Sequence, residues 1–252
     1  MVHEARRHLV LIHGGGVGPW MWRKQVEHFA GDFVVHTPTL PGHDPRASRD
    51  FTTNRDAAQS VADQVDLSSL QGDVAVVGFS IGGQVAIELA QLFPDRVDRL
   101  GVVSSLVAPM AGSSVLAIMS SWATPLASNE RFARAQAKQL YIGDDDFDDY
   151  FAVSQALTHL TMMAMLTANF SFRPGDTLFS SPLPTLTFAG SREQKSLVRG
   201  MQHLAERMPA GSFELVEGVG HGIPLARPDA FNARLGEWLG ERRGVNRAPI
   251  RG

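Results

Sequence analysis

Six short apolar runs recur along the chain, and most of them are continuous instead of alternating with polar residues. Continuous apolar runs of this length are typical of strands that are buried on both faces of a parallel sheet. The runs predict strands at 8–12, 33–37, 73–78, 99–104, 185–189 and 212–216.

Between these runs, apolar residues recur at the spacing of amphipathic helices. The spacing predicts helices at 20–30, 54–70, 82–93, 194–208 and 228–241. Because strand and helix alternate, the pattern predicts an α/β fold, with a mostly parallel sheet of about six strands flanked by helices.

The alternation stops between residues 109 and 182, where helical patterns continue without a strand pattern. We expect residues 1–108 and 183–252 to form the core, and residues 109–182 to form a helical lid inserted between two strands. Methionine side chains adapt to apolar pockets, so Met162 in this segment is a candidate substrate contact. The alternative interpretation is that its methionines only pack the lid onto the core, and both can hold. Five of the nine methionines lie here, namely Met110, Met119, Met162, Met163 and Met165.

Composition narrows the class of protein. The chain has 252 residues, of which 44% are hydrophobic and 19% charged, and a formal net charge of −3. These values fit one large globular domain and argue against nucleic acid or an anionic membrane as the main partner. No run approaches the roughly 20 apolar residues of a membrane span, and the first run is too short for a signal peptide, so a cytoplasmic protein is expected. The basic end, 242–252, is expected to be a loose tail.

Several chemistries are excluded by what the chain lacks. It has no cysteine, which excludes disulfides, thiolate nucleophiles and cysteine zinc sites. The acidic run 143–151 lacks the spacing of a calcium loop, and we interpret it as the start of a helix, where carboxylates suit the dipole. We expect no metal site and no cofactor.

One serine lies where a predicted strand meets a predicted helix. The segment Gly78-Phe79-Ser80-Ile81-Gly82 fits G-x-S-x-G between the two. Such a turn is sharp, holds the serine in a strained conformation, and admits only small residues two positions before and after it. A serine in an ordinary glycine-containing turn is the alternative. Because both flanking elements are present, Ser80 is predicted to be a nucleophile.

A glycine-rich loop follows the first predicted strand, in LVLIHGGGVGPWMW at 9–22. Acyl transfer places negative charge on a carbonyl oxygen, which two fixed N–H groups can stabilise. We expect one from Ile81, the residue after the nucleophile, and one from Gly15, with Gly16 as the alternate. A phosphate-binding loop would need Lys-Ser/Thr or G-x-G-x-x-G here, and neither pattern is present.

A serine nucleophile needs a base, and a carboxylate that orients this base. His221 follows the last predicted strand on a glycine-containing loop, so it is expected at the same sheet edge as Ser80. Glu193 is the one carboxylate in the turn after the strand at 185–189, and Asp176 is a second candidate. Two other histidines are interpreted differently. We interpret His13 as part of the turn geometry and His43 as a loop residue near the site.

Taken together, these motifs resemble the α/β-hydrolase superfamily. HGGGVGPWMW, LPGHDPR, VVGFSIGG and GVGHGIPLARPDAF carry the resemblance, which spans residues 9 to about 240. The resemblance implies a serine esterase-like member with Ser80, Glu193 and His221 as triad. The chain looks like a compact form that lacks the usual N-terminal strand pair.

Three departures from the family pattern matter, and the first is the missing N-terminal strand pair. The acid position carries Glu193, where Asp is commoner. The related hydroxynitrile lyases have a lysine where this chain has Gly222 and a threonine where it has Gly14, which argues against lyase chemistry. Dehalogenases and epoxide hydrolases of the superfamily use an aspartate nucleophile, which Ser80 excludes.

The leading hypothesis is a cofactor-free serine hydrolase (carboxylesterase-like) acting on a small, apolar carboxylic ester or lactone through an acyl-enzyme. In one alternative, the protein has the same fold but catalyses a non-hydrolytic reaction, such as acyl transfer, C–C bond cleavage or cofactor-less oxygenation. Another is a ligand-binding protein with a residual triad. Oligomeric state is not indicated by the sequence. The expected substrate contacts are Gly14, Gly16, Trp20, Trp22, Phe79 and Met162.

Overall fold

A six-stranded parallel sheet forms the centre of the computed structural model, which describes residues 6–46, 49–110, 112 and 129–240. The strand order is β2-β1-β3-β4-β5-β6, and each neighbouring pair is parallel. All six strands coincide with predicted runs to within one residue at each end, which confirms the predicted sheet. They are β1 (His8–Ile12), β2 (Val34–His36), β3 (Val74–Phe79), β4 (Arg99–Val103), β5 (Thr185–Gly190) and β6 (Gly211–Val216).

The strands near the centre of the sheet are buried on both faces, as their continuous apolar runs predict. Every residue of β1, β3 and β5 is buried. Alternate residues of β1 enter different cores: Val10 packs in one cluster, and Leu9 and Leu11 in another. Successive side chains of a strand point to opposite faces, so the two clusters are the two sides of the sheet.

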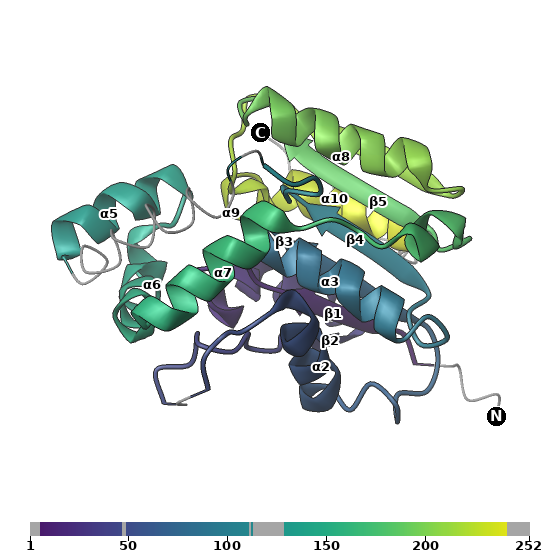
Figure 1. The fold of residues 1–252 in the computed structure, drawn as a ribbon, viewed down its shortest axis with the longest axis horizontal. Coiled ribbons are helices and arrows are strands. Elements are labelled where there is room, and N and C mark those ends of the chain that lie inside the picture. The colour runs from purple at the N-terminus through teal and green to yellow at the C-terminus, as the bar shows by residue number, and fades with distance from the viewer. Residues whose placement is uncertain (1–5, 47–48, 111, 113–128, 241–252) are drawn as a thin grey trace.

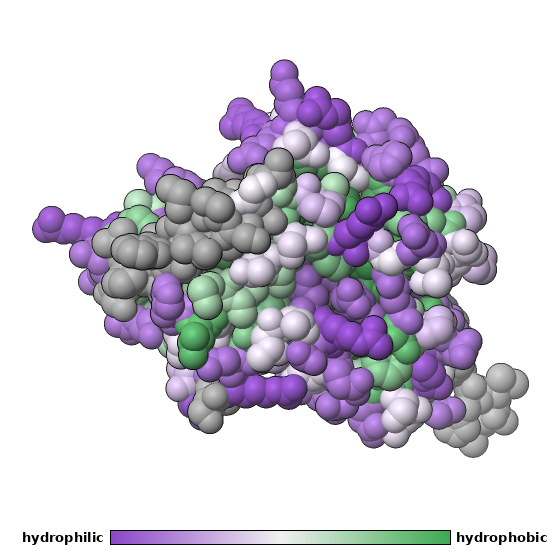
Figure 2. Space-filling view, viewed as in Figure 1, coloured by the Kyte–Doolittle hydropathy of each residue, from purple (hydrophilic) through white to green (hydrophobic). Residues whose placement is uncertain are grey.

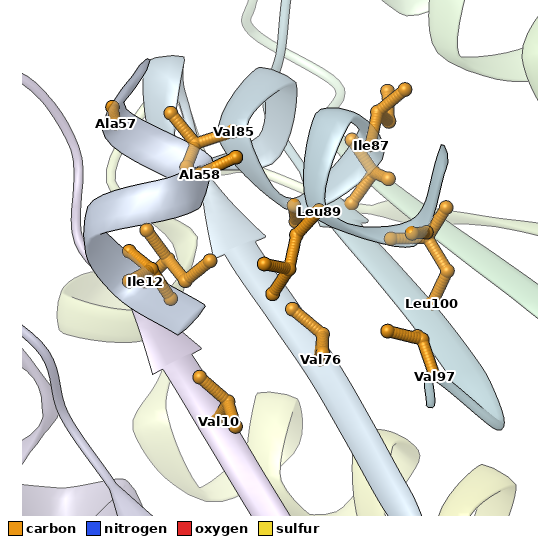
Figure 3. Packing of buried hydrophobic residues seen from close by; sticks show 14 of the residues in the cluster. Val10, Ile12, Ala57, Ala58, Val76, Val85, Ile87, Leu89, Val97 and Leu100 are labelled. Carbon is orange, nitrogen blue, oxygen red and sulfur yellow. The ribbon is translucent and has the colours of Figure 1, made fainter. Parts of the chain in front are cut away.

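Helices cover both sides (Figure 1). One side carries α2 (Asn54–Gln64), α3 (Ile81–Leu92) and α8 (Lys195–Arg207). Figure 3 shows this packing, with Val10, Ile12 and Val76 of the strands beneath apolar side chains of α2 and α3. The other side carries α1 (Arg23–Phe29), the short α9 (Ile223–Ala226) and α10 (Pro228–Leu239).

The helix predicted at 54–70 is shorter than expected. It begins at Asn54, where the Thr53 side chain accepts a hydrogen bond from the Asp56 N–H, and it ends at Gln64. Asp66 has a φ of +48°, in the left-handed region that a right-handed helix cannot include. The residues that follow form turns, which a hydrophobic pattern alone does not distinguish from another helical turn.

A helical segment lies between β4 and β5, and no strand occurs among its described residues. It contains α5 (Glu130–Gln139), α6 (Asp144–Ala156), α7 (His159–Ser171) and the 3-10 helix η3 (Asp176–Ser180). In Figure 1, α5 and α6 extend to one side of the sheet and α7 crosses toward α3. The acidic run forms the first turn of α6, as interpreted from the sequence. Figure 2 shows apolar surface along α7, where Leu160 is 62% exposed.

Within the described residues, no single helix is long and apolar enough to cross a membrane. The α6 and α7 pair reaches that length and composition only jointly, and the chain bends by 99° between the two helices.

Candidate active site

Ser80 occupies a strained turn between β3 and α3. Its φ of +57° and ψ of −123° lie outside the regions that a non-glycine residue ordinarily adopts. Neighbouring backbone holds it there: the Ser80 N–H donates to the Val103 carbonyl at 2.8 Å, and its carbonyl accepts from the Gly83 N–H at 2.9 Å and the Ser105 hydroxyl at 2.8 Å. The turn predicted from G-x-S-x-G is therefore present.

The two glycines of the motif are required by close backbone approach. A Cβ added at Gly78 would lie 2.0 Å from the Gly82 carbonyl oxygen, and one added at Gly82 would lie 2.3 Å from the His13 carbonyl oxygen. Real Cβ atoms do not approach backbone this closely. The strand, the helix and the glycine-rich loop are therefore in close contact at the position of Ser80.

His221 and Glu193 complete a chain of hydrogen bonds that ends at Ser80. The His221 Nε2 lies 3.0 Å from the Ser80 Oγ, and its Nδ1 lies 2.7 Å from the Glu193 Oε1. The Glu193 side chain is 2% exposed and that of His221 is 36% exposed. The carboxylate accepts only, so Nδ1 carries the proton and Nε2 presents its lone pair to the serine hydroxyl. The geometry matches that of a nucleophile, base and acid.

Glutamate has a longer side chain than aspartate, and here hydrogen bonds to the second carboxylate oxygen of Glu193 hold that side chain in place. The Ser104 hydroxyl donates to the Glu193 Oε2 at 3.0 Å, and the Gly190 N–H donates to the same oxygen at 2.7 Å. Ser104 follows β4 with a φ of +51°. Sequence reasoning missed Ser104, because a serine after a strand carries no sign of a partner 89 residues away. Asp176, the second candidate, lies instead in the first turn of η3.

Two further side chains support the loop that carries His221. The Phe79 ring lies 5.0 Å from the His221 ring between centroids, which places Phe79 beneath the base. The Tyr141 hydroxyl accepts a hydrogen bond from the Gly220 N–H at 3.0 Å. Tyr141 comes from the helical segment and was not found from the sequence.

The glycine-rich loop lies against Ser80 from the other side. A Cβ added at Gly14 would lie 2.8 Å from the Phe79 ring and 3.3 Å from the Ser80 Cβ. One added at Gly15 would lie 2.7 Å from the Met165 sulfur and 3.5 Å from the Ile81 side chain. The structure therefore brings Gly15 and Ile81, the two predicted oxyanion donors, to neighbouring positions beneath α7.

Two cavities meet at Ser80, and their walls share Ser80, Gln136, Leu140 and Asn169. The smaller cavity has a volume of about 250 Å³ and the larger one about 680 Å³. The other walls of the smaller cavity are Gly15, Gly16, Ile81, Tyr150, Ser154, Leu157, Met162, Met165 and Leu166. The other walls of the larger cavity are Ser104, Leu106, Met110, Gln139, Phe170, Arg192, Glu193, Gln194, Leu197 and His221.

The predicted substrate contacts divide into three groups. Gly16 and Met162 lie in the wall of the smaller cavity. Gly14 and Phe79 lie behind the wall, against Ser80 and His221. Trp20 and Trp22 form a third group, which lies in neither described wall.

The placement of Trp22 corrects its prediction as a substrate contact, whereas that of Trp20 stays a prediction. Trp22 is fully buried and packs at 6.3 Å from the Phe231 ring, between ring centroids. Trp20 is half-buried against the same core cluster. Both belong to the 3-10 helix η1 (Pro19–Trp22), which directs them toward the sheet side that carries α10. Their closeness to the glycine loop in sequence gave no information on this direction.

No group of three or more histidine, aspartate or glutamate side chains is arranged to hold a metal ion in the part of the chain that the structure describes. The described site residues are instead joined by the hydrogen bonds from Ser80 to His221 and from His221 to Glu193.

Comparison with known proteins agrees with this fold. A pimeloyl-[acyl-carrier protein] methyl ester esterase of Aromatoleum aromaticum is 28% identical over 247 residues, which cover 89% of this chain and 94% of that protein. An (E)-2-((N-methylformamido)methylene)succinate hydrolase of Acinetobacter baylyi is 23% identical over 253 residues, which cover 92% and 89%.

Solved structures share the fold. MenH from S. aureus has a TM-score of 0.78 at 20% identity, covering 95% of this chain and 96% of its own. A thermophilic esterase from Thermogutta terrifontis has a TM-score of 0.73 at 20% identity, covering 94% and 92%. Residues 9–234 match the sequence profile of the alpha/beta hydrolase family, and the chain belongs to this family.

Proposed function

We propose that the protein is a serine esterase that cleaves a small, largely apolar carboxylic ester or lactone through an acyl-enzyme. The observation that carries this proposal is the hydrogen-bonded chain from the Ser80 Oγ to the His221 Nε2 (3.0 Å), and from the His221 Nδ1 to Glu193 (2.7 Å). The named activity of the Aromatoleum relative, a methyl ester esterase, independently supports a carboxylic ester as the bond that is cleaved.

The proposed reaction begins with proton transfer from Ser80 to His221. The Ser80 oxygen attacks the ester carbonyl as the His221 Nε2 takes the hydroxyl proton, and Glu193 stabilises the imidazolium that forms. The carbonyl oxygen becomes an oxyanion, which the N–H groups of Gly15 and Ile81 stabilise. His221 then gives its proton to the leaving alcohol, and the acyl group remains on Ser80.

Water completes the cycle by the same groups in reverse. His221 takes a proton from water, which attacks the acyl-enzyme carbonyl, and the carboxylic acid leaves as Ser80 regains its proton. No step requires a metal or an organic cofactor.

The two cavities support a division of the substrate into two parts. The smaller cavity has aliphatic walls from Ile81, Leu157 and Met162 and their neighbours beside a few polar side chains, and its volume of about 250 Å³ suits a short apolar group. The larger cavity has polar walls as well, including Gln139 and Arg192. We assign the short acyl group to the smaller cavity and the alcohol to the larger one.

The helical segment supplies most of the wall that faces Ser80, which supports its assignment as a lid. Gln136, Leu140 and Asn169 border both cavities and lie on or directly after helices of this segment. In this proposal residues 109–182 form the lid, and residues 1–108 and 183–252 form the catalytic core. Residues 111 and 113–128 of the proposed lid lie outside the described residues.

The experiment that tests this function is steady-state hydrolysis of p-nitrophenyl esters with acyl chains from C2 to C12. We expect hydrolysis that prefers short chains, and a loss of kcat of about 10³-fold or more in Ser80→Ala. Ser68→Ala, which changes an exposed serine in a turn, is the matched control and should keep wild-type rates. Turnover that survives in Ser80→Ala would contradict the proposed nucleophile and favour a non-hydrolytic mechanism.

A further inference from the structure

Two buried histidines join the glycine-rich loop to the loop after β2. His13 follows β1 and is 0% exposed, and His43 lies in the LPGHDPR segment and is 1% exposed. Their ring centroids lie 5.0 Å apart, with the ring planes at 62°. Neither ring belongs to the triad, and the reaction described above uses neither as an acid or a base.

Each ring accepts a hydrogen bond from the backbone of the opposite loop. The Leu40 N–H donates to the His13 Nε2 at 3.0 Å, and the Gly16 N–H donates to the His43 Nε2 at 3.0 Å. A nitrogen that accepts an N–H carries a lone pair, so the proton of each neutral ring is on Nδ1. Each loop thus donates one backbone N–H to a histidine of the other loop, and the two hydrogen bonds hold the loops together.

The Nδ1 atoms face carbonyl oxygens, which agrees with this assignment. The His13 Nδ1 lies 2.8 Å from the Gly14 carbonyl oxygen, and the His43 Nδ1 lies 3.0 Å from the Pro41 carbonyl oxygen. Burial and the nearby His43 lower the pKa of His13 to about 3. Burial lowers the pKa of His43 to about 4. Both rings are therefore neutral at pH 7, with every ring nitrogen hydrogen-bonded.

These contacts fix the two peptide planes on either side of the Gly15 Cα. The Gly14 carbonyl and the Gly15 N–H belong to one planar trans peptide and point in opposite directions. His13 holds that carbonyl, so the Gly15 N–H is directed away from the buried ring. In the next peptide the Gly16 N–H points toward His43 and is already engaged. Gly16 has a φ of +74°, which glycine adopts without strain and which reverses the direction of the chain there.

We propose that His13 and His43 are positioning residues of the oxyanion hole, which hold Gly15 as its donor and withdraw the Gly16 N–H from that role. The inference rests on the proposed function, because it concerns the same carbonyl oxygen. It also resolves the choice between Gly15 and Gly16 that the sequence left open. A protonated or truncated ring at position 43 releases the Gly16 N–H and frees both peptide planes to rotate.

The experiment compares two amide replacements of His43 that keep different halves of its hydrogen bonding. In His43→Gln the side-chain oxygen reaches the position of Nε2 and can accept from Gly16. In His43→Asn the shorter amide reaches only the position of Nδ1 and can donate to Pro41. We expect His43→Asn to lower kcat for p-nitrophenyl acetate about 30- to 100-fold, with KM changed less than about 3-fold. We expect kcat of His43→Gln to stay within about 5-fold of wild type, since it keeps the contact to Gly16.

The contrast between the two variants separates positioning from general stability. Equal loss of kcat in both variants, or wild-type kcat in His43→Asn, would overturn the proposal. If His43→Asn does not fold, long-range ¹H–¹⁵N correlation spectra of the wild-type protein give the tautomers directly. Nδ1–H in both rings supports the proposal, and Nε2–H in His43 overturns it.

A second readout identifies the donor without turnover. After wild-type protein reacts with diethyl p-nitrophenyl phosphate, the amide protons of Gly15 and Ile81 should move downfield while that of Gly16 keeps its frequency. A downfield shift at Gly16 in place of Gly15 overturns the positioning inference alone. Failure of the reagent to modify Ser80 contradicts the proposed function instead, so the two failures are distinguishable.

Discussion

The sheet core and the helical segment border the same candidate site in different ways. Ser80, Glu193, His221 and Gly15 all follow strands of the sheet, and hydrogen bonds hold the first three in place. The helical segment instead provides side chains such as Gln136 that face the serine across a cavity. In the proposed function, the core therefore determines which reaction is possible, whereas the helical segment determines which substrate fits. Substitutions in the core should alter the catalytic rate or the stability of the fold. Substitutions in the helical segment should alter the preference among substrates.

The largest effect is expected from removing the charge that orients the base. Glu193→Gln keeps the shape of the side chain but replaces the carboxylate that accepts from the His221 Nδ1. We expect kcat to fall about 10³- to 10⁴-fold with KM little changed, because His221 loses both its tautomer and its counter-charge. Steady-state hydrolysis of p-nitrophenyl acetate measures this change. Glu206→Gln, on the exposed side of α8, is the control, and a comparable loss there would contradict the assignment.

A structural test of the core concerns the turn that holds Ser80. In Gly78→Ala the new methyl would lie 2.0 Å from the Gly82 carbonyl oxygen, so the strand and the helix must separate. We expect the free energy of unfolding to fall by about 3 kcal/mol or more, measured by urea denaturation. In Gly31→Ala the methyl has no atom within 4 Å, and a change within about 0.5 kcal/mol is expected. Equal stability of the two variants would argue against a tightly packed turn.

The neutral histidines make the free energy of unfolding depend on pH. Burial lowers the pKa of His43 to about 4 in the folded protein, whereas the unfolded chain protonates near pH 6.5. Between these values the unfolded state binds more protons, so the free energy of unfolding falls as the pH falls. The contribution is about 1.4 kcal/mol per pH unit, and stability from this group is fully present only above about pH 6.5. His13, with a pKa of about 3, acts in the same direction.

This pH dependence is measured by urea denaturation between pH 4.5 and 6, in wild type and His43→Gln. Carboxylates titrate in both proteins. The difference between the two slopes of the free energy of unfolding against pH therefore reports the titration of His43. We expect the variant to be less steep by about 1.4 kcal/mol per pH unit. Parallel slopes would mean that the ring at position 43 titrates alike in the folded and unfolded states.

The smallest effect is expected in the helical segment. Leu157 borders the smaller cavity, and Leu157→Ala enlarges it without a change to the triad. We expect kcat/KM for C6 relative to C2 esters to rise about 5-fold, while kcat for the C2 ester stays within about 2-fold of wild type. Leu160→Ala, at a residue 62% exposed, is the matched control. An unchanged chain-length profile in Leu157→Ala would place the acyl group outside this cavity.

The same division explains what could be predicted from the sequence. The strands were predictable because burial on both faces leaves a continuous apolar run, as in β3 and β5. Ser80, Glu193 and His221 could be found because each lies shortly after such a run, and their catalytic roles stay predictions. The helix at 54–70 was predicted too long because the left-handed backbone of Asp66 leaves no trace in the hydrophobic pattern.

Contacts between distant parts of the chain were not predictable. Ser104 reaches Glu193 across 89 residues and Tyr141 reaches Gly220 across 79, and no local pattern records such pairs. Trp22 shows the opposite error, because its position next to the glycine loop suggested a cavity wall while its side chain fills the core. Side-chain direction depends on the helical turn that carries it, which the sequence did not reveal.

Covalent trapping by an organophosphate shows whether Ser80 is the nucleophile. The protein is treated with diethyl p-nitrophenyl phosphate, and the modified residue is located by mass spectrometry of peptides. We expect one diethylphosphoryl group, on Ser80, and no modification of Ser80→Ala. A label on another residue, or an unmodified Ser80 in folded wild-type protein, would contradict the assignment of Ser80 as the nucleophile.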